Sequence, residues 1–165
     1  MNDIEQQVSP LIRQLGETLT AQGSLLASAE SCTGGLAAAL LTALPGSSAW
    51  FERGFVAYSN ESKTEMLSVS AQTLTKHGSV SEAAVAQMAV GAIARSRASV
   101  AIAMSGVAGP SGGSPDKPIG MVCLAWYLGP NVIHTATEHF AGDRSAIRGQ
   151  TVRTSIEGLL SRLAA

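Results

Sequence analysis

Ser28-Ala29-Glu30-Ser31-Cys32-Thr33-Gly34-Gly35 places carboxylate, hydroxyl and thiol groups between two apolar runs. Leu25-Leu26-Ala27 precedes this stretch and 36–41 follows it, so the sequence predicts a buried strand that turns directly into a helix. Backbone N–H groups converge at the start of a helix, and the helix dipole favours anions there. Gly34 and Gly35 have no Cβ, which lets a ligand approach the backbone. The local pattern by itself favours Ser and Thr as plain caps of the helix, and the alternative is an anion-stabilising site.

Length and composition predict one domain with a core of small side chains. The chain has 165 residues, of which 45% are hydrophobic and only 4% aromatic, and domains typically run to roughly 100–200 residues. Its formal net charge of -1 gives no basic surface. Nucleic-acid binding through phosphate neutralisation is therefore not expected.

The sequence carries no pattern of secretion, membrane insertion or metal binding. Cys32 and Cys123 are too few and too far apart for a disulfide framework or a zinc site, which favours reduced thiols in a cytoplasmic protein. The first residues lack the basic and apolar regions of a signal peptide, and no apolar run approaches the roughly 20 residues that a spanning helix needs. We expect a cytoplasmic protein with no membrane association, no metal and no cofactor.

Helical and strand patterns alternate along the chain, which predicts an α/β fold. The expected helices cover 4–22, 36–44, 59–67, 70–77, 81–97 and a final segment that includes 147–163. The expected strands cover 25–29, 54–58, 100–104, 119–128 and 132–140, the last two forming a hairpin.

Two further segments are expected near the first turn. Tyr58 and Lys63 flank a second strand-to-helix junction, and the two junctions should face one crevice, because open α/β sheets bind ligands at the carboxyl ends of their strands. Segment 106–118 holds four glycines and three prolines. A loop of this length is usually functional, and the alternative is a flexible linker. Because an apolar strand resumes at Ile119, we expect the loop to fold over the strand end.

Two arginines lie one turn apart near the start of the last helix, Arg144 and Arg148. Positive charge is unfavourable at a helix N-terminus, because the dipole is positive there as well. The pair therefore predicts a bound anion, which guanidinium groups hold well.

A set of segments in a fixed order carries a family resemblance. They are Ala29-Glu30-Ser31-Cys32-Thr33-Gly34-Gly35, Pro45-Gly46-Ser47-Ser48, Phe51-Glu52-Arg53-Gly54, Tyr58-Ser59-Asn60 with Lys63, Gly78-Ser79-Val80-Ser81, Ser105-Gly106-Val107-Ala108-Gly109-Pro110 with Gly112-Gly113, and Gly142-Asp143-Arg144 with Arg148. They resemble the CinA C-terminal domain family, whose enzymatic members are nicotinamide-nucleotide amidases. Many relatives have threonine where this chain has Ser105, so the hydroxyl is kept.

The resemblance implies a fold and an activity. The implied fold is a single three-layer α/β/α domain over residues 1–165, with a mostly parallel, mixed central sheet. The implied reaction is hydrolysis of nicotinamide mononucleotide to nicotinate mononucleotide and ammonia, a step of pyridine nucleotide salvage. Family members form homodimers or higher homo-oligomers. Longer members place a nucleotide pyrophosphatase domain in front of this one, so no pyrophosphatase activity is expected.

Amide hydrolysis needs a strong nucleophile and a stabilised oxyanion. We expect Ser31 to attack the carboxamide and Lys63 to take its proton, since burial can lower the pKa of a lysine. Tyr58 is expected to hydrogen-bond within this pair, and the N–H groups of Cys32 and Thr33 to form the oxyanion hole. The alternative nucleophile is the Cys32 thiol, because thiols at helix N-termini are activated.

The remaining expected site residues bind substrate. Glu30, Gly34 and Gly35 belong to this group, although Glu30 could instead stabilise the helix start. Ser105, Gly106 and Gly109 are expected to line the nucleotide pocket, and Arg144 or Arg148 to hold the 5′-phosphate. His77, His134 and His139 lie outside the family segments, so a Ser-His-Asp triad is not expected. Two other functions stay open, a serine amidase for another small carboxamide and a catalytically silent nucleotide-binding module.

Overall fold

The computed structural model of the protein describes residues 2–165 and has a five-stranded mixed sheet as its middle layer. The strands are β1 (Leu26–Glu30), β2 (Phe51–Val56), β3 (Val100–Gly106), β4 (Met121–Gly129) and β5 (Val132–His139), in the order β2-β1-β3-β4-β5. Strand β1 pairs in parallel with both β2 and β3, whereas the β3–β4 and β4–β5 pairings are antiparallel. The expected mixed sheet is confirmed, and its parallel part consists of the three strands at one edge.

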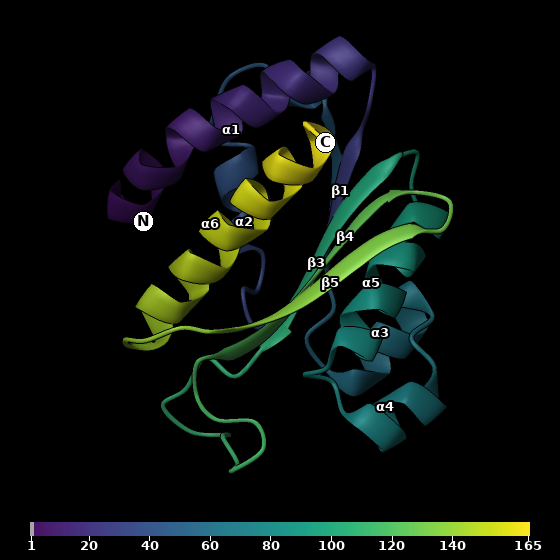
Figure 1. Cartoon of the computed structure of the whole chain (residues 1–165), viewed down its shortest axis with the longest axis vertical. Coiled ribbons are helices and arrows are strands. Elements are labelled where there is room, and N and C mark those ends of the chain that lie inside the picture. Colours follow the sequence, from purple (N-terminus) through teal and green to yellow (C-terminus); the bar gives the residue numbers. More distant parts are fainter. Residues whose placement is uncertain (1) are drawn as a thin grey trace.

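Helices cover both faces of this sheet, which confirms the three-layer α/β/α architecture (Figure 1). One face carries α1 (Asn2–Gln22), α2 (Leu36–Leu41) and α6 (Arg144–Leu163), and the other carries α3 (Asn60–Leu67), α4 (Ala71–His77) and α5 (Glu82–Ala94). A short 3-10 turn, Ser47–Ala49, precedes β2. Within residues 2–165, no helix combines the length and apolar character that a membrane span requires.

The two faces of the sheet differ in side-chain size. In β3, Ile102 and Met104 point toward α1 and α6, whereas Ala101 and Ala103 point toward α5. The alanines let α5 lie close to the sheet, as the small-residue composition predicts. The packing is so close that a Cβ added at Gly91 of α5 would lie 1.9 Å from the carbonyl oxygen of Leu67, at the end of α3.

Local capping explains where most helices begin. The side chains of Ser59, Ser70 and Ser81 accept N–H groups at the starts of α3, α4 and α5, and Asp143 does the same for α6. The sequence predicts that the second strand begins at Gly54, whereas β2 begins at Phe51. The charged side chains of Glu52 and Arg53 are not typical of a buried strand, so the sequence pattern did not indicate its first residues. Charged residues are typical of an edge strand, and β2 is one.

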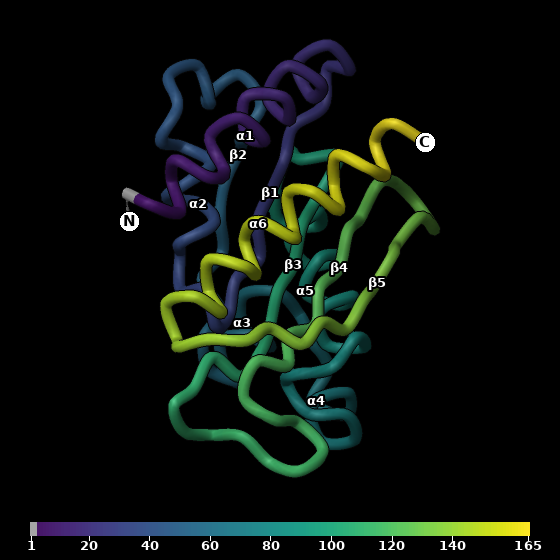
Figure 2. The backbone as a smooth tube through the Cα atoms, turned by 60° about the vertical axis from the view of Figure 1, so that its left-hand side comes forward, coloured from purple at the N-terminus to yellow at the C-terminus, as the bar shows by residue number. Residues whose placement is uncertain are grey.

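The glycine-rich loop connects the end of β3 with the start of β4 and lies at the same end of the molecule as α4 (Figures 1 and 2). The Val107 N–H donates to the Met121 carbonyl at 2.9 Å, and the Gly120 N–H donates to the Val107 carbonyl at 2.8 Å. These bonds close the base of the loop, so the expected fold over the strand end is confirmed.

Replacement Gly91→Ala tests the close approach of α5 to α3. The added methyl group meets backbone rather than a movable side chain, so we expect the free energy of unfolding to fall by about 1–3 kcal/mol. The measurement is urea denaturation followed by circular dichroism. Gly149→Ala in α6 is the matched control, because its Cβ would meet side-chain atoms of Ile4, the nearest at 3.2 Å, and no backbone. Equal losses in the two variants would contradict this account of the packing.

Candidate active site

The structure brings the two strand-to-helix junctions together at the carboxyl ends of the parallel strands. Ser31 follows β1, and Lys63 lies on α3, which follows β2. The Lys63 Nζ and the Ser31 Oγ are 2.9 Å apart, a hydrogen-bonding distance. The two junctions therefore meet, as expected, at these two side chains, and the crevice between them stays a prediction.

Lys63 is a buried amine with three oxygen neighbours. Its side chain is 1% exposed, and besides Ser31 its Nζ donates to the carbonyl oxygens of Ala57 at 3.1 Å and Tyr58 at 3.2 Å. A neutral amine has two N–H groups and one lone pair. As an ammonium, Lys63 can donate to all three oxygens; as a neutral amine, it can donate to the two carbonyls and accept the Ser31 O–H with its lone pair. Burial lowers the pKa of Lys63, so the neutral form that this arrangement suits becomes easier to reach.

The segment 31–35 forms two consecutive turns. The Gly34 N–H donates to the Ser31 carbonyl at 3.0 Å, and the Leu36 N–H donates to the Thr33 carbonyl at 3.1 Å. Gly34 and Gly35 have φ values of 57° and 95°, a left-handed conformation that glycine adopts without strain. The bonds of these turns do not use the N–H groups of Cys32 and Thr33, the positions expected for an oxyanion hole.

Glu30 supplies the cap of α2. Its carboxylate is fully buried and accepts the N–H groups of Gly35, Ala37 and Ala38 at 2.8–3.0 Å. The N-cap residue itself is Gly35, without a side-chain hydrogen bond, so the interpretation of Ser or Thr as the cap is wrong. Because these N–H groups occupy both carboxylate oxygens, Glu30 stabilises the helix start and is not available to bind substrate directly.

Cys32 is a poor nucleophile in this environment. Its side chain is 6% exposed, and burial raises the pKa of the thiol to about 11. The charges of Arg148 and Lys63 act in the opposite direction, but burial is the larger effect. The thiol is therefore protonated near neutral pH, which argues against the alternative nucleophile.

Tyr58 reaches the Ser–Lys pair through its backbone. Its carbonyl accepts the Lys63 Nζ, whereas its phenol is on a residue that is 60% exposed and accepts the Arg144 Nη2 at 3.0 Å. The expectation that Tyr58 hydrogen-bonds within the pair is thus met by the carbonyl and not by the phenol. The same Arg144 donates through Nη1 to the Gly109 carbonyl at 3.0 Å.

The last residues of β3 lie next to the turn of residues 31–35. Ser105 is 1% exposed and follows Met104, whose carbonyl accepts the Ser31 N–H at 3.0 Å. Ser105 therefore lies beside this turn, which we call the signature turn. A Cβ at Gly106 would lie 2.5 Å from Val122 Cγ2, so strand packing accounts for this glycine.

Two cationic side chains fix the loop itself. Arg144 holds the Gly109 carbonyl, and the Lys117 Nζ donates to the His77 carbonyl at the end of α4. The flexible-linker interpretation is therefore wrong.

Arg148 contacts the signature turn from α6. Its Nη2 donates to the Thr33 carbonyl at 2.6 Å. The expected spacing of Arg144 and Arg148 on one helix face is confirmed, but both guanidinium groups bond to neutral oxygens of the protein. Sequence reasoning missed these contacts because the partners are 86 and 115 residues apart and no local pattern indicates them.

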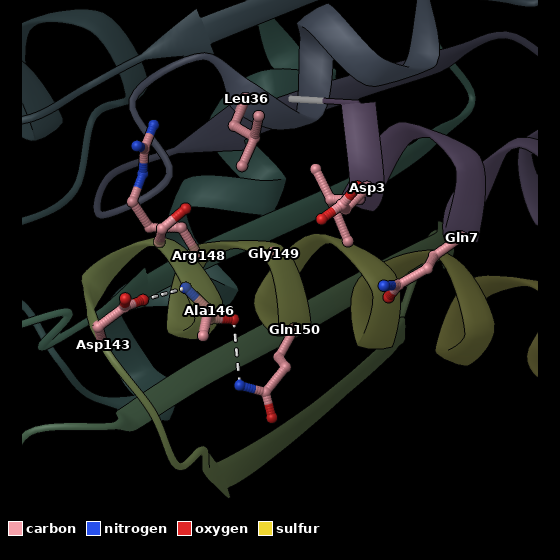
Figure 3. A pocket seen from close by; sticks show the side chains of 10 residues that line it. Asp3, Gln7, Leu36, Asp143, Ala146, Arg148, Gly149 and Gln150 are labelled. Atoms are coloured by element: carbon pink, nitrogen blue, oxygen red, sulfur yellow. Dashed lines mark hydrogen bonds between the residues drawn. The ribbon is translucent and has the colours of Figure 1, made fainter.

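A groove of about 1090 Å³ lies on the other side of Arg148, between the starts of α1, α2 and α6. Figure 3 shows Asp3, Gln7 and Leu36 around it, whereas Ser31 and Lys63 are not among its lining residues. Among residues 2–165, no group of three or more His, Cys, Asp and Glu side chains could hold a metal ion.

Thiol modification tests the account of Cys32. Burial raises the pKa of both Cys32 and Cys123, so we expect neither thiol of the folded protein to react readily with an aromatic disulfide reagent at pH 7. Both should react once guanidinium chloride unfolds the chain, as absorbance of the released thiolate reports. The Cys123→Ala variant reports on Cys32 alone. Rapid reaction of this variant in the folded state would contradict the account of Cys32 as a buried, protonated thiol.

Comparisons with known proteins agree with this architecture. The CinA C-terminal domain family matches residues 8–163. Nicotinamide-nucleotide amidohydrolase PncC of Escherichia coli K12 is 46% identical over 155 residues, which is 94% of each chain. The protein of the same name from Pseudomonas putida is 48% identical over 153 residues, 93% of this chain and 95% of its own. The crystal structure of the competence/damage inducible protein CihA from Agrobacterium tumefaciens superposes with a TM-score of 0.91 at 44% identity, over 99% of this chain and 96% of that chain. This protein belongs to the CinA C-terminal domain family.

Proposed function

We propose that the protein is a nicotinamide-nucleotide amidase, which hydrolyses nicotinamide mononucleotide to nicotinate mononucleotide and ammonia in pyridine nucleotide salvage. The observation that carries the proposal is the buried contact of Lys63 Nζ with Ser31 Oγ at 2.9 Å. The names of the PncC relatives support the choice of substrate. We take residues 1–165 to act as one amidase domain that requires neither metal nor cofactor.

The first half of the reaction forms an acyl-enzyme. The Ser31 hydroxyl attacks the carboxamide carbon while its proton passes to the neutral amine of Lys63. The N–H groups of Cys32 and Thr33 stabilise the negative charge that develops on the carboxamide oxygen. The bond from carbon to nitrogen then breaks, and the Lys63 ammonium returns the proton to the leaving group, which departs as ammonia.

The second half releases the acid. A water molecule attacks the ester of Ser31, and Lys63 takes a proton from it. When the ester bond breaks, the same proton returns to the Ser31 oxygen. Nicotinate mononucleotide leaves, and both side chains are restored to their starting state.

Substrate binding falls to the walls of the crevice. Arg144 is exposed and bonds to both the Tyr58 phenol and the Gly109 carbonyl, and we assign it to the 5′-phosphate. Ser105 and the loop after it would border the ribose and the base. The substrate is the only non-protein partner we assign, and a homodimer or higher homo-oligomer remains the expectation from the family.

Two other functions are tested with the same assay. A serine amidase for another small carboxamide would release ammonia faster from that compound than from the nucleotide. A silent binding module would bind the nucleotide without turnover, although the buried Ser31 and Lys63 pair argues against this alternative.

Variants Ser31→Ala and Lys63→Met test the proposed chemistry. Each removes one partner of the proton transfer, so we expect kcat for ammonia release to fall by at least about 1000-fold. Enzyme-coupled ammonia detection provides the rate. The matched controls are Ser99→Ala and Lys76→Met, which change exposed side chains away from the pair and should keep wild-type rates. Full activity of Ser31→Ala would remove the assignment.

The pH dependence tests the role of Lys63. Burial lowers the pKa of Lys63, and only the neutral amine accepts a proton. We therefore expect kcat/KM to rise with pH and then to level off, with the midpoint of the rise below pH 10.5. Because the folded state releases the proton at a lower pH than the unfolded chain, the free energy of unfolding should also rise with pH up to about 10.5. Lys63→Met should lose this component of the stability profile. A rate that falls as pH rises toward the plateau region would contradict the assignment.

A further inference from the structure

Arg148 has an unusual environment for an arginine. It is only partly exposed, its Nε is buried, and no acceptor for that Nε occurs among residues 2–165. The recorded bond of its guanidinium is the one from Nη2 to the Thr33 carbonyl. A buried guanidinium N–H is costly when it has no acceptor, and a carboxylate is the usual partner of such a group.

The ion pairs within residues 2–165 are those of Arg53 with Glu52 and of Arg153 with Glu157, so Arg148 forms none there. The buried carboxylate of Glu30 also lies at this turn, and the charges of Arg148 and Glu30 act on the Cys32 thiol in opposite directions. The field of Arg148 reaches Cys32, where it opposes the effect of burial on the pKa of the thiol. A positive charge at this position favours any anion that forms at the turn.

The turn is held by its own backbone bonds and by Glu30, and Arg148 adds a bond from another helix. Gly34 and Gly35 adopt positive φ, and glycine has the widest range of accessible conformations. The Thr33 carbonyl accepts both the Leu36 N–H at 3.1 Å and the Arg148 Nη2 at 2.6 Å. Arg148 thus fixes, from a different element, the residue whose own N–H we assign to the oxyanion hole.

We propose that Arg148 is a positioning residue, which holds the Thr33 carbonyl so that the N–H groups of Cys32 and Thr33 face the oxyanion. This inference rests on the proposed amidase function. It replaces the expectation that Arg148 holds the 5′-phosphate and leaves that role to Arg144, whose guanidinium is exposed.

Kinetics on two substrates distinguish positioning from phosphate binding. Nicotinamide mononucleotide carries the phosphate, and nicotinamide riboside lacks it. Because a small displacement of catalytic groups can reduce a rate by about 100-fold, Arg148→Met should lower kcat by about 10–100-fold on both substrates. The KM values should change by less than about three-fold. Arg148→Lys, which keeps the charge and a donor, should recover part of kcat.

The matched control is Arg153→Met, which removes an exposed arginine from the same helix and should leave both kinetic constants unchanged. Thermal unfolding verifies that each variant is folded. If Arg148→Met does not fold, the test uses Arg148→Lys by itself. A decrease in kcat of this variant on both substrates would then support the proposal. A loss confined to the mononucleotide and expressed in KM, or an unchanged kcat, would overturn it.

A substrate-independent readout separates this proposal from the amidase function. In labelling by a fluorophosphonate, the Ser31 Oγ displaces fluoride from phosphorus while Lys63 takes the proton, and the phosphoryl oxygen occupies the oxyanion position. If wild type releases no ammonia from either substrate, the amidase proposal fails. Slower labelling of Arg148→Met than of wild type still supports positioning. Equal labelling rates overturn positioning alone, and an unlabelled wild type overturns both proposals.

Discussion

The burial of one amine against one hydroxyl determines how the rest of this structure is used. Lys63 loses its contact with water and gains two carbonyl oxygens and Ser31 in return. Removing a charged ammonium group from water is unfavourable, so this environment shifts the group toward the neutral amine. A neutral amine beside a hydroxyl is a base placed next to its proton donor. In the parallel part of the sheet, neighbouring carboxyl ends bring these two side chains together although they are 32 residues apart.

Around this pair, the walls of the site depend on contacts between distant elements. Glu30 caps α2 from within the sheet, and the two arginines of α6 extend to opposite walls. Arg148 bonds to the turn after β1, and Arg144 bonds to both the β2–α3 junction and the loop after β3. Helix α6 therefore contacts three segments that follow three different strands.

Much of the fold could be predicted from local sequence. Apolar periodicity indicated the long helices, continuous apolar runs indicated the buried strands, and serine caps placed the starts of α3 and α5. Strand β2 began earlier than predicted, since its charged residues are tolerated only because the strand lies at an edge. The family resemblance supplied Ser31 and Lys63, and elementary packing of parallel strands explains why they meet.

The contacts of the charged side chains could not be predicted in the same way. Glu30 was considered both as a ligand group and as a helix stabiliser, and only the positions of three N–H groups decide between these roles. The partners of Arg144 and Arg148 depend on how α6 crosses the sheet. The sequence also does not indicate that the Tyr58 phenol bonds to Arg144 rather than to Ser31 or Lys63.

The position of α6 in the chain has a consequence for biosynthesis. During translation, Ser31 and Lys63 leave the ribosome long before 144–163, and the first three strands can already pair. The nascent protein would then contain Ser31 and Lys63 without the guanidinium groups of α6. Completion of the last helix would therefore add the bonds of Arg144 and Arg148 to a pair of junctions that precede them in synthesis.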